Sequence, residues 1–381
     1  MPLARSLQKK TMITPKTRLF LLILLFIILP GCDKTNTTTP IFFTSSELVT
    51  PLTSVISTVT PTLTPYPTSE FLMSPITEIV VEEKQPNSNE WETFVSNKDV
   101  QIGDIYDIAF GVDGSVWFAS GGQFSGIITY KNGEWKSYTP GNGYSIFHKI
   151  VVTDENIVYV IATAPNAVSD HRIIGKFDKK NWTWWTDVTV AVTSDFVITP
   201  DNQIWVSLDD GVLELNGNNW VYKDMNHPIT HLSPDGTMWS DGRWFMKDGK
   251  WVEVPYTAEY FLPGVQPGEG FSGVLVFINF GLENSMWYKI KYYGFVHVYE
   301  TGKFDFYRTV EYTQNFSTLN GLVTDDGVFW FSGYGGIFNF DGKRWNHVEY
   351  GNDTIISMEE SPNGEIWFGG IGEIYRYAPQ K

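Results

Sequence analysis

Seven segments with one shared pattern dominate the sequence beyond residue 110. Each places a turn, such as Asp113-Gly114 or Asn363-Gly364, directly before a strand-like apolar run that contains an aromatic residue. Self-similarity at intervals of 34 to 48 residues is typical of repeat architectures, in which each unit buries its apolar surface against its neighbours. The seven aromatic markers are Trp117, Tyr159, Trp205, Trp239, Trp287, Trp330 and Trp367, and the Tyr159 unit is degenerate.

A second turn and a second aromatic strand follow most of these markers. Asn132-Gly133-Glu134-Trp135 and Asp341-Gly342-Lys343-Arg344-Trp345 are examples, and their Asn-Gly and Asp-Gly pairs supply the positive φ angles that tight hairpins need. Each unit therefore contains four short strands, a to d, and no segment shows a sustained helical period. Four antiparallel strands in about 40 residues are the signature of a β-propeller blade.

The two ends of the repeat region predict how the ring closes. The seventh unit stops after a c strand at Ile374–Tyr377, whereas Asn89–Phe94 reads like a d strand that precedes any blade of its own. We therefore predict an all-β, seven-bladed propeller over residues 89–381, with the N-terminal strand completing the last blade. A six-bladed ring, in which the Tyr159 unit is not a blade, is the alternative.

Residues 1–31 have the composition of an export signal. Five basic residues precede an unbroken apolar run from Leu19 to Leu29, which is too short to span a bilayer as a helix. The run ends in Leu29-Pro30-Gly31-Cys32, which resembles the lipobox of bacterial lipoproteins. This resemblance implies lipidation of Cys32 and an extracytoplasmic protein anchored in the cell membrane. An uncleaved signal anchor with an incidental thiol is the alternative.

Residues 32–88 are rich in Thr, Ser and Pro and predict a disordered tether. Repeated Pro disfavours both helices and central strands, and few large apolar residues are available for a core. As a flexible coil this segment would span roughly 40 Å, enough to hold a domain away from lipid head groups.

Composition narrows the classes of partner. A net charge of −16 argues against nucleic acid, since binding a phosphate backbone needs a concentrated basic surface. The single cysteine argues against a disulfide scaffold, and 16% aromatic residues argue against a disordered chain. The expected partners are the membrane, through the lipid, and a glycan, peptide or cell-envelope protein, with the propeller itself monomeric.

The repeats also resemble a known family. Val116-Trp117-Phe118 with Gly126-Ile127, and Phe329-Trp330-Phe331 with Gly336-Ile337, are similar to the two-component regulator propeller repeat. Such propellers form the extracytoplasmic sensing portions of larger receptors, so the resemblance implies binding or sensing. No kinase, transmembrane output or DNA-binding segment is evident in the sequence, and we do not expect signalling by this chain itself.

Loop lengths predict where a ligand binds. The a–b and c–d turns are tight, while the long connections are b–c loops and d–a crossovers, which share one face of the ring. We expect any ligand on that face, although ordinary solvated loops remain the alternative for each residue. The candidates are Gln123, Phe124, Tyr144, Asp170, His171, Arg172, Tyr260, Phe261, Gln314 and Tyr334.

Catalytic and metal signals are weak. The acidic pairs Asp209-Asp210, Asp325-Asp326 and Glu359-Glu360 could hold Ca²⁺, but none has EF-hand spacing. No nucleophile elbow, phosphate loop or zinc cluster is present, so we identify no catalytic residue and no required cofactor. An enzyme remains the alternative, because streptogramin lyases also form Trp-bearing seven-bladed propellers, and that resemblance implies Mg²⁺ with a His and an acid near the ring axis. His148 and His231 are the candidates for the histidine of such a site.

Overall fold

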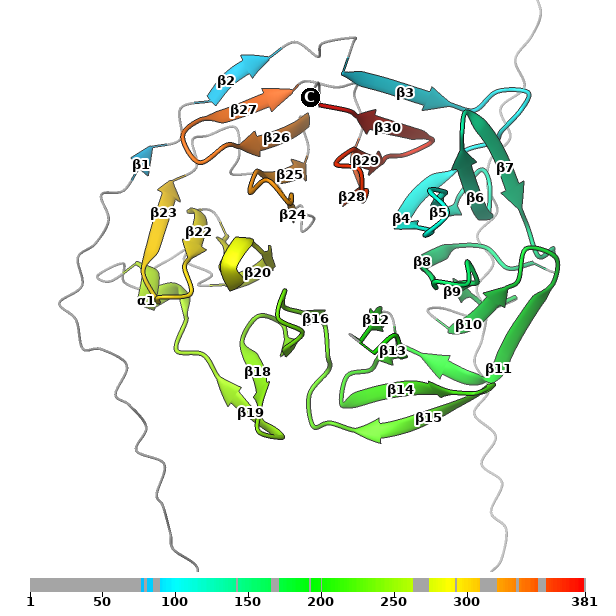
Figure 1. Cartoon of the computed structure of the whole chain (residues 1–381), viewed down its shortest axis with the longest axis horizontal. Helices are drawn as coiled ribbons and strands as arrows, with labels where there is room; N and C mark the ends of the chain where they lie inside the picture. Colours follow the sequence, from blue (N-terminus) through cyan, green and yellow to red (C-terminus); the bar gives the residue numbers. More distant parts are fainter. Residues whose placement is uncertain are drawn as a thin grey trace, which may run out of the picture. The chain divides into compact units, whose positions relative to one another are not determined.

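The computed structural model describes the propeller and short parts of the chain before it. The described residues are 77–78, 81–84, 90–141, 143–165, 171–191, 193–199, 201–262, 274–291, 293–308, 321–333, 336–348 and 354–379. They form seven sheets arranged in a ring (Figure 1), which confirms the seven-bladed prediction and excludes six blades. The Tyr159 unit, despite its degenerate sequence, is a complete blade.

The first four blades each contain four antiparallel strands in chain order. Blade 1 contains β4 (Asp104–Phe110), β5 (Val116–Gly121), β6 (Gly126–Lys131) and β7 (Glu134–Tyr138). Blade 2 contains β8 (Phe147–Val152), β9 (Val158–Thr163), β10 (Arg172–Phe177) and β11 (Trp182–Val190). Blade 3 contains β12 (Phe196–Ile198), β13 (Ile204–Ser207), β14 (Gly211–Asn216) and β15 (Asn219–Asp224). Blade 4 contains β16 (His231–Leu232), β17 (Met238–Ser240), β18 (Trp244–Lys247) and β19 (Lys250–Glu253).

The last three blades complete the ring. Blade 5 contains β20 (Leu275–Phe280), β21 (Met286–Ile290), β22 (Gly294–Val298) and β23 (Phe304–Arg308). Blade 6 contains β24 (Gly321–Val323), β25 (Phe329–Gly333), β26 (Gly336–Phe340) and β27 (Trp345–Val348). Blade 7 contains β28 (Ser357–Glu360), β29 (Ile366–Gly369) and β30 (Glu373–Tyr377), and its outer strand is β3 (Trp91–Val95).

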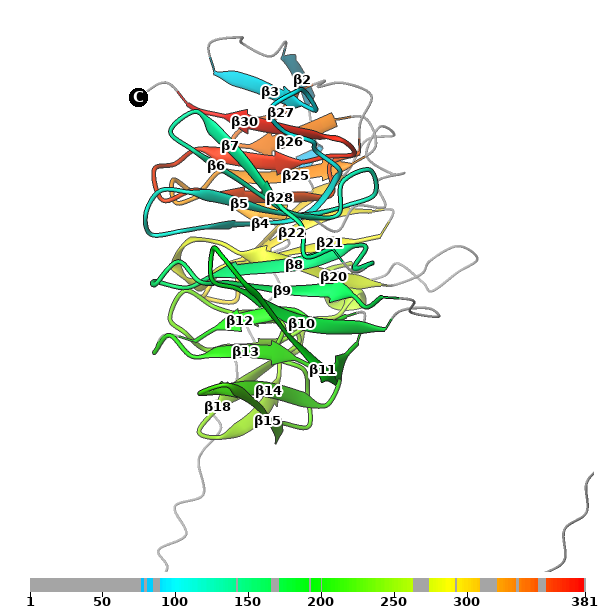
Figure 2. The same cartoon turned by 90° about the vertical axis from the view of Figure 1, so that its right-hand side faces the viewer.

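The N-terminal strand closes the ring as predicted. β3 pairs antiparallel with β30, from Trp91 opposite Tyr377 to Val95 opposite Glu373. Seen from the side (Figure 2), β3 lies against the C-terminal strands although nearly the whole domain separates them in sequence. Blade 7 is therefore complete only when the two ends of the domain have met.

Two further strands lie within the range predicted as a tether. β1 (Thr77–Glu78) pairs in parallel with β23, and β2 (Val81–Lys84) pairs in parallel with β27. The chain before the propeller thus adds a fifth strand to the outer edges of blades 5 and 6. In the part of the chain that the structure describes, no helix has the length and apolar character needed to cross a membrane.

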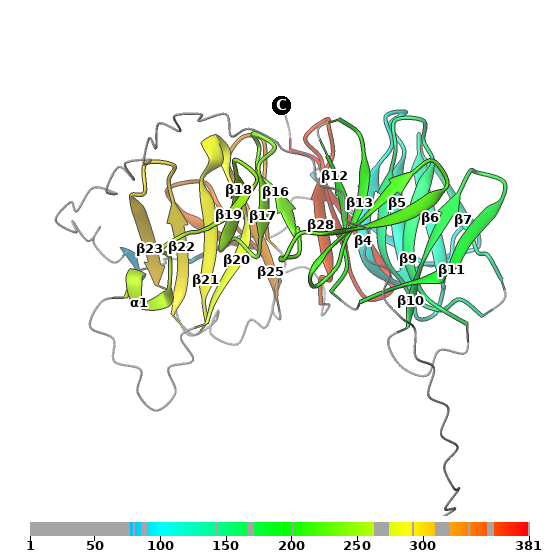
Figure 3. The ribbon, with the colours of Figure 1, turned by 90° about the horizontal axis from the view of Figure 1, so that it is seen from below.

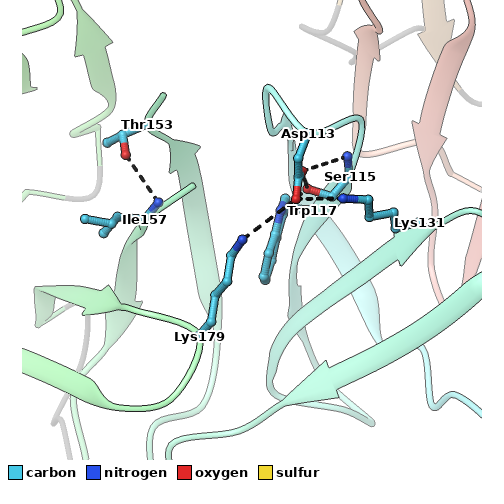
Figure 4. Close-up of polar contacts among 7 residues, drawn as sticks. All are labelled: Asp113, Ser115, Trp117, Lys131, Thr153, Ile157 and Lys179. Atoms are coloured by element: carbon cyan, nitrogen blue, oxygen red, sulfur yellow. Dashed lines mark hydrogen bonds and ion pairs between the residues drawn. The ribbon is translucent and has the colours of Figure 1, made fainter. Parts of the chain in front are cut away.

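All seven a–b turns share one geometry. In each, the first residue's N–H donates to the carbonyl oxygen four residues on, as from Thr153 to Ile157 and from Ser361 to Glu365. In the Thr153 turn the Ile157 N–H also donates to the Thr153 hydroxyl at 3.2 Å (Figure 4). The fourth residue of each turn is Gly or Asn with φ between 56° and 85°, a region that other residues rarely adopt. In five turns the first residue is Ser or Thr, whose hydroxyl donates to the side chain two residues on, a regularity that the sequence analysis missed.

The aromatic markers pack between neighbouring blades, as the sequence predicts. Trp367 of blade 7 lies against Phe118 and Tyr130 of blade 1, with ring centroids 5.6 and 5.3 Å away. Trp287 of blade 5 stacks on Phe329 of blade 6 at 4.3 Å. These contacts bury the faces that a single four-stranded sheet would leave in water.

The connections between strands lie on two opposite faces of the ring. The tight a–b and c–d turns share one face, and the b–c and d–a connections share the other. The short helix α1 (Ala258–Phe261) is part of the d–a connection between blades 4 and 5, and Figure 3 shows the ring edge-on with α1 beside blade 5. A 3₁₀ turn, η1 (Leu282–Asn284), forms the a–b turn of blade 5.

Replacing Trp91 tests whether ring closure stabilises the whole domain. Trp91 is 6% exposed and lies 4.9 Å from Tyr377 and 5.5 Å from Phe368 between ring centroids. We expect Trp91→Ala to lower the free energy of unfolding in urea by about 3–5 kcal/mol. Val95→Ala, in the same strand but 49% exposed, is the matched control, and similar losses for the two variants would contradict this account.

Candidate functional site

The seven inner strands surround a polar channel at the ring axis. All seven blades contribute to the wall of a cavity of about 520 Å³, either from an inner strand or from the residue just before it. Although blade cores are apolar, this wall carries ionisable and amide side chains from six blades. They are Asp107, Lys149, Asp195, His231, Asn279 and Glu359.

Several of these side chains reach to the following blade. The Lys149 Nζ lies 2.5 Å from the Asp195 carboxylate, joining blade 2 to blade 3. The Asp107 carboxylate accepts a 2.9 Å hydrogen bond from the Ile150 N–H of blade 2, and Asn279 Nδ2 donates to the Gly321 carbonyl of blade 6. The channel wall is therefore cross-linked by polar contacts near the axis, where the strands of neighbouring blades come close together.

Two carboxyl groups of the channel hold their protons more tightly than usual. Burial raises the pKa of Asp107 to about 6, with Lys149 opposing the shift and Asp195 adding to it. Burial also raises the pKa of Glu359 to about 8, assisted by the negative charge of Asp107. At neutral pH Glu359 is therefore mainly a protonated hydrogen-bond donor, while Asp107 is mainly an ionised acceptor.

His231 faces the same channel from the inner strand of blade 4. Burial lowers its pKa to about 4, although the nearby Asp195 charge opposes this, so the imidazole is neutral at physiological pH. Its Nδ1 lies 2.8 Å from the Thr230 hydroxyl, and Phe277 packs against the ring with centroids 4.8 Å apart. A neutral imidazole beside carboxyl groups can exchange a proton with a bound polar molecule.

An aromatic residue connects the channel to the loop-bearing face. Tyr106 lines the channel and lies 5.7 Å from the His148 ring between centroids. A Cβ added at Gly121 would come within 3.0 Å of both Tyr106 and Ile146, which shows how closely the b–c loop of blade 1 and the next d–a loop approach Tyr106. His148 itself contacts the Thr163 hydroxyl at 2.8 Å and does not line the channel.

The predicted loop residues of blades 1 and 2 lie on the expected face. Gln123 is exposed, and the partly buried Phe124 contributes a carbonyl that accepts a 2.9 Å hydrogen bond from the Ser120 hydroxyl. Tyr144 stacks on Trp184 with centroids 3.9 Å apart, while His171 is exposed and contacts the Thr189 hydroxyl at 3.1 Å. The fifth described candidate in this group, Arg172, is half-buried at the start of β10.

The candidates on α1 are less suited to binding. Phe261 is 1% exposed and packs in the apolar core with Tyr256 and Tyr288, so the prediction that it contacts a ligand is wrong. Tyr260 is half-buried and lies beside Phe304. The amphipathic helix turns its aromatic side chains inward, a direction that residue type alone does not indicate. Asp170, Gln314 and Tyr334 lie outside the described residues, as does Cys32.

The acidic pairs proposed for Ca²⁺ do not converge on one ion. Glu359 lines the channel, but the adjacent Glu360 lies between blades and accepts a 2.7 Å hydrogen bond from the Asp325 N–H. Asp209 accepts a hydrogen bond from the Thr193 hydroxyl. In the ranges that the structure describes, no group of three or more His, Cys, Asp or Glu side chains is placed to hold a metal ion.

Most of the channel residues were missed by sequence reasoning. His231 was predicted through the lyase resemblance, and Glu359 was noted as half of an acidic pair. Asp107 and Lys149 sit beside apolar residues in the inner strands β4 and β8, and such a charge in a short, largely buried strand was the available signal. The strand register shifts between Ile105 and Asp107, and between Phe147 and Lys149. These shifts interrupt the regular alternation of side chains between the two sides of the strand, so the sequence alone does not indicate which side chains face the axis.

Comparison with known proteins supports the fold. No protein-family model matches the chain, and no curated protein matches it. A streptogramin B lyase structure aligns with a TM-score of 0.53 and 16% identity, covering 76% of this chain and 97% of the lyase. A catalytically inactive virginiamycin B lyase from Staphylococcus aureus with quinupristin aligns with a TM-score of 0.55 and 14% identity, covering 76% and 100%.

Extracellular domains of two bacterial regulatory systems share the same architecture. The extracellular domain of a putative hybrid two-component system from B. thetaiotaomicron aligns with a TM-score of 0.52 and 17% identity, covering 76% of this chain and 41% of that chain. A putative one-component system from the same organism aligns with a TM-score of 0.55 and 14% identity, covering 77% and 40%. At these identities the similarity establishes the propeller fold.

The raised pKa of Glu359 predicts a pH-dependent stability. The folded protein binds this proton more tightly than the unfolded chain, so its contribution is complete below about pH 4.5 and is lost as pH rises through about 8. Glu359 lies deep in the ring, but its side chain borders the open channel, so solvent screening reduces the effect. We compare the free energy of unfolding of Glu359→Gln with that of wild type. We expect this difference to shift in favour of the variant by about 1–2 kcal/mol as the pH rises from about 5 to about 9.

Urea unfolding at the two pH values measures this change. Glu134→Gln, with a side chain that is 78% exposed, is the control and should show no such pH dependence. A pH-independent difference between Glu359→Gln and wild type would contradict the raised pKa.

Proposed function

We propose that the protein is an extracytoplasmic binding or sensing module whose ligand enters the axial channel from the face of the b–c and d–a loops. The observation that carries the proposal is the cavity of about 520 Å³ whose wall is built by all seven blades and carries six ionisable or amide side chains. Rigid repeats around a polar cavity hold these groups at fixed positions, which favours selective binding.

The protonation states favour an uncharged polar ligand. At neutral pH the channel presents a protonated Glu359, an ionised Asp107, the Lys149–Asp195 pair and a neutral His231. Donors and acceptors are thus mixed within one cavity, and the lysine charge is already balanced. Hydroxyl or amide groups, as in a glycan or a peptide, match such a surface better than a strongly charged ligand does.

Aromatic residues near the rim support the same ligand classes. Tyr106 lies in the channel wall, and Tyr144, in the connection that leads into blade 2, stacks on Trp184 of the outer strand β11. Flat aromatic faces beside hydrogen-bonding groups suit sugar rings and peptide groups. Tyr144 and Arg172 are therefore proposed to contact the part of the ligand that extends beyond the channel.

The cellular location forms part of the proposal. The lipobox-like Leu29–Cys32 segment and the resemblance to regulator propellers support a lipid-anchored protein outside the cytoplasm. The similarity of the fold to extracellular sensor domains agrees with this location. Signalling would then depend on a separate partner that recognises the ligand-bound propeller.

A lyase activity is the second candidate. It is favoured by the presence of His231 and carboxyl groups in one channel, the arrangement that the lyase resemblance requires. The channel does not fit the implied Mg²⁺, because the Lys149 ammonium lies 2.5 Å from Asp195, and we derive no metal-assisted step. Cleavage of quinupristin that is lost in His231→Ala, but kept in His148→Ala, would favour this second function.

Substitutions in the channel test the binding proposal. After a ligand is selected on a glycan array or peptide library, Asp107→Asn and Glu359→Leu should each weaken its affinity by about tenfold, because each change removes or weakens a hydrogen bond to the ligand. Titration calorimetry measures the change. Glu360→Gln, the neighbouring residue on β28 but outside the channel, should bind normally. Unchanged affinity in both channel variants would place the ligand elsewhere.

Substitution of Cys32 tests the anchor. We expect Cys32→Ala to move the protein from the membrane fraction to the soluble fraction and to abolish incorporation of labelled palmitate, since the thiol is the acceptor of the lipid. Pro30→Ala keeps the cysteine and makes the segment more like the common lipobox, so it should stay membrane-bound. Undiminished membrane retention of Cys32→Ala would contradict a lipid anchor.

A further inference from the structure

A second cavity lies between blades 6 and 7, on the opposite face from the loops. Its volume is about 570 Å³, and its wall includes the a–b turns of both blades, at Thr324–Val328 and Gly364. The N-terminal strand and the end of β30 complete it, through Trp91 and Tyr377. The two blades are neighbours at the point where the ring closes (Figure 1).

The charged groups of this cavity are all acidic. Glu90, Asp326, Asp341 and Glu360 line it, and none of its lining residues is Lys, Arg or His. Asp341 pairs with the exposed Arg344 at 4.0 Å. Within the described part of the chain, Glu90, Asp326 and Glu360 form no ion pair, so their negative potential is not neutralised by the protein itself.

Aromatic side chains provide the apolar part of the wall. Tyr377 lies 4.9 Å from Trp91 and 5.2 Å from Trp330 between ring centroids, and all three rings line the cavity. Burial raises the pKa of Tyr377, and the charges of Glu90 and Asp326 raise it further, which shows that the acids act on this aromatic wall. Aromatic faces beside carboxylates attract organic cations.

An unused acceptor is buried in the same wall. Asn346 is 3% exposed, its Nδ2 donates to Asn339 Oδ1 at 2.9 Å, and its Oδ1 has no hydrogen-bond partner. A buried carbonyl-type oxygen without a donor costs free energy that a bound N–H group would recover. The cavity thus combines hydrogen-bond acceptors with aromatic faces, and a positively charged donor is the ligand group that complements this combination.

We propose that this cavity, named here the interblade pocket, binds an organic cation, an alkylammonium or a guanidinium group. The absence among the described residues of a group of three metal-ligating side chains, together with the size of the cavity, favours such a cation over a metal ion. The same group could belong to a small free molecule or to a Lys or Arg side chain of another protein, and the two sources share this chemistry.

Calorimetric titration of the full-length protein tests the proposal. The probes are n-butylammonium and n-butylguanidinium, with 1-butanol as the uncharged comparison and Ca²⁺ as the metal comparison. We expect at least one organic cation to bind roughly tenfold more tightly than 1-butanol. N-acetyl-lysine amide and N-acetyl-arginine amide distinguish the sources, since their binding indicates a protein side chain and binding of the butyl cations alone indicates a free molecule.

Asp326→Asn is the decisive variant. It removes one charge but keeps the turn, because Asn363 occupies the same turn position in blade 7 and accepts the Ser361 hydroxyl in the same way. Asp235→Asn makes the equivalent change in blade 4, away from the interblade pocket. We expect Asp326→Asn to weaken cation binding roughly fivefold or more while Asp235→Asn and the channel variant Asp107→Asn do not.

Three results would overturn the proposal. They are equal binding of the cations and 1-butanol, tighter binding of Ca²⁺ at the interblade pocket than of either cation, and unchanged cation affinity in Asp326→Asn. Because the axial channel and the interblade pocket share no lining residue, failure here leaves the proposed function intact.

Discussion

Pairing of β3 with β30 is the interaction on which the rest of the structure depends. It joins residues near the start of the domain to its last strand, and Trp91 at the first position of β3 packs into the aromatic cluster of blades 6 and 7. Without it, blade 7 would expose an edge and the ring would not be held closed. Both the axial channel and the interblade pocket need that closure, since blade 7 provides Glu359 to one and Glu360 to the other.

Glu359 and Glu360 are adjacent on β28, yet they line two different sites. Successive side chains on β28 point to opposite sides, so Glu359 pairs across from Trp367 and faces the axis, while Glu360 pairs across from Ile366 beside blade 6. A twisted inner strand thus serves both the channel and the surface between blades. The proposed glycan or peptide site and the proposed cation site are consequences of the same geometry.

The architecture could be predicted because its signals are local. Positive-φ turn residues such as Gly114 and Gly364, and aromatic markers such as Trp367, define each blade within a few residues. The channel could not be predicted in the same way, because β-bulges before Asp107 and Lys149 change which residues face the axis. Phe261 shows the opposite error, where an aromatic residue in a predicted binding loop is part of the core.

Direct titration of the channel carboxyl groups tests the central claim, which is that seven inner strands hold a partly buried, electrostatically coupled polar site at the axis. Carbon-13 NMR of carboxyl-labelled protein, with Glu359→Gln and Asp107→Asn used for assignment, measures each pKa. The account predicts a pKa of about 8 for Glu359 and about 6 for Asp107, both above their usual values because of burial. Ordinary values near 4 for both groups would show an open, fully hydrated axis and would contradict it.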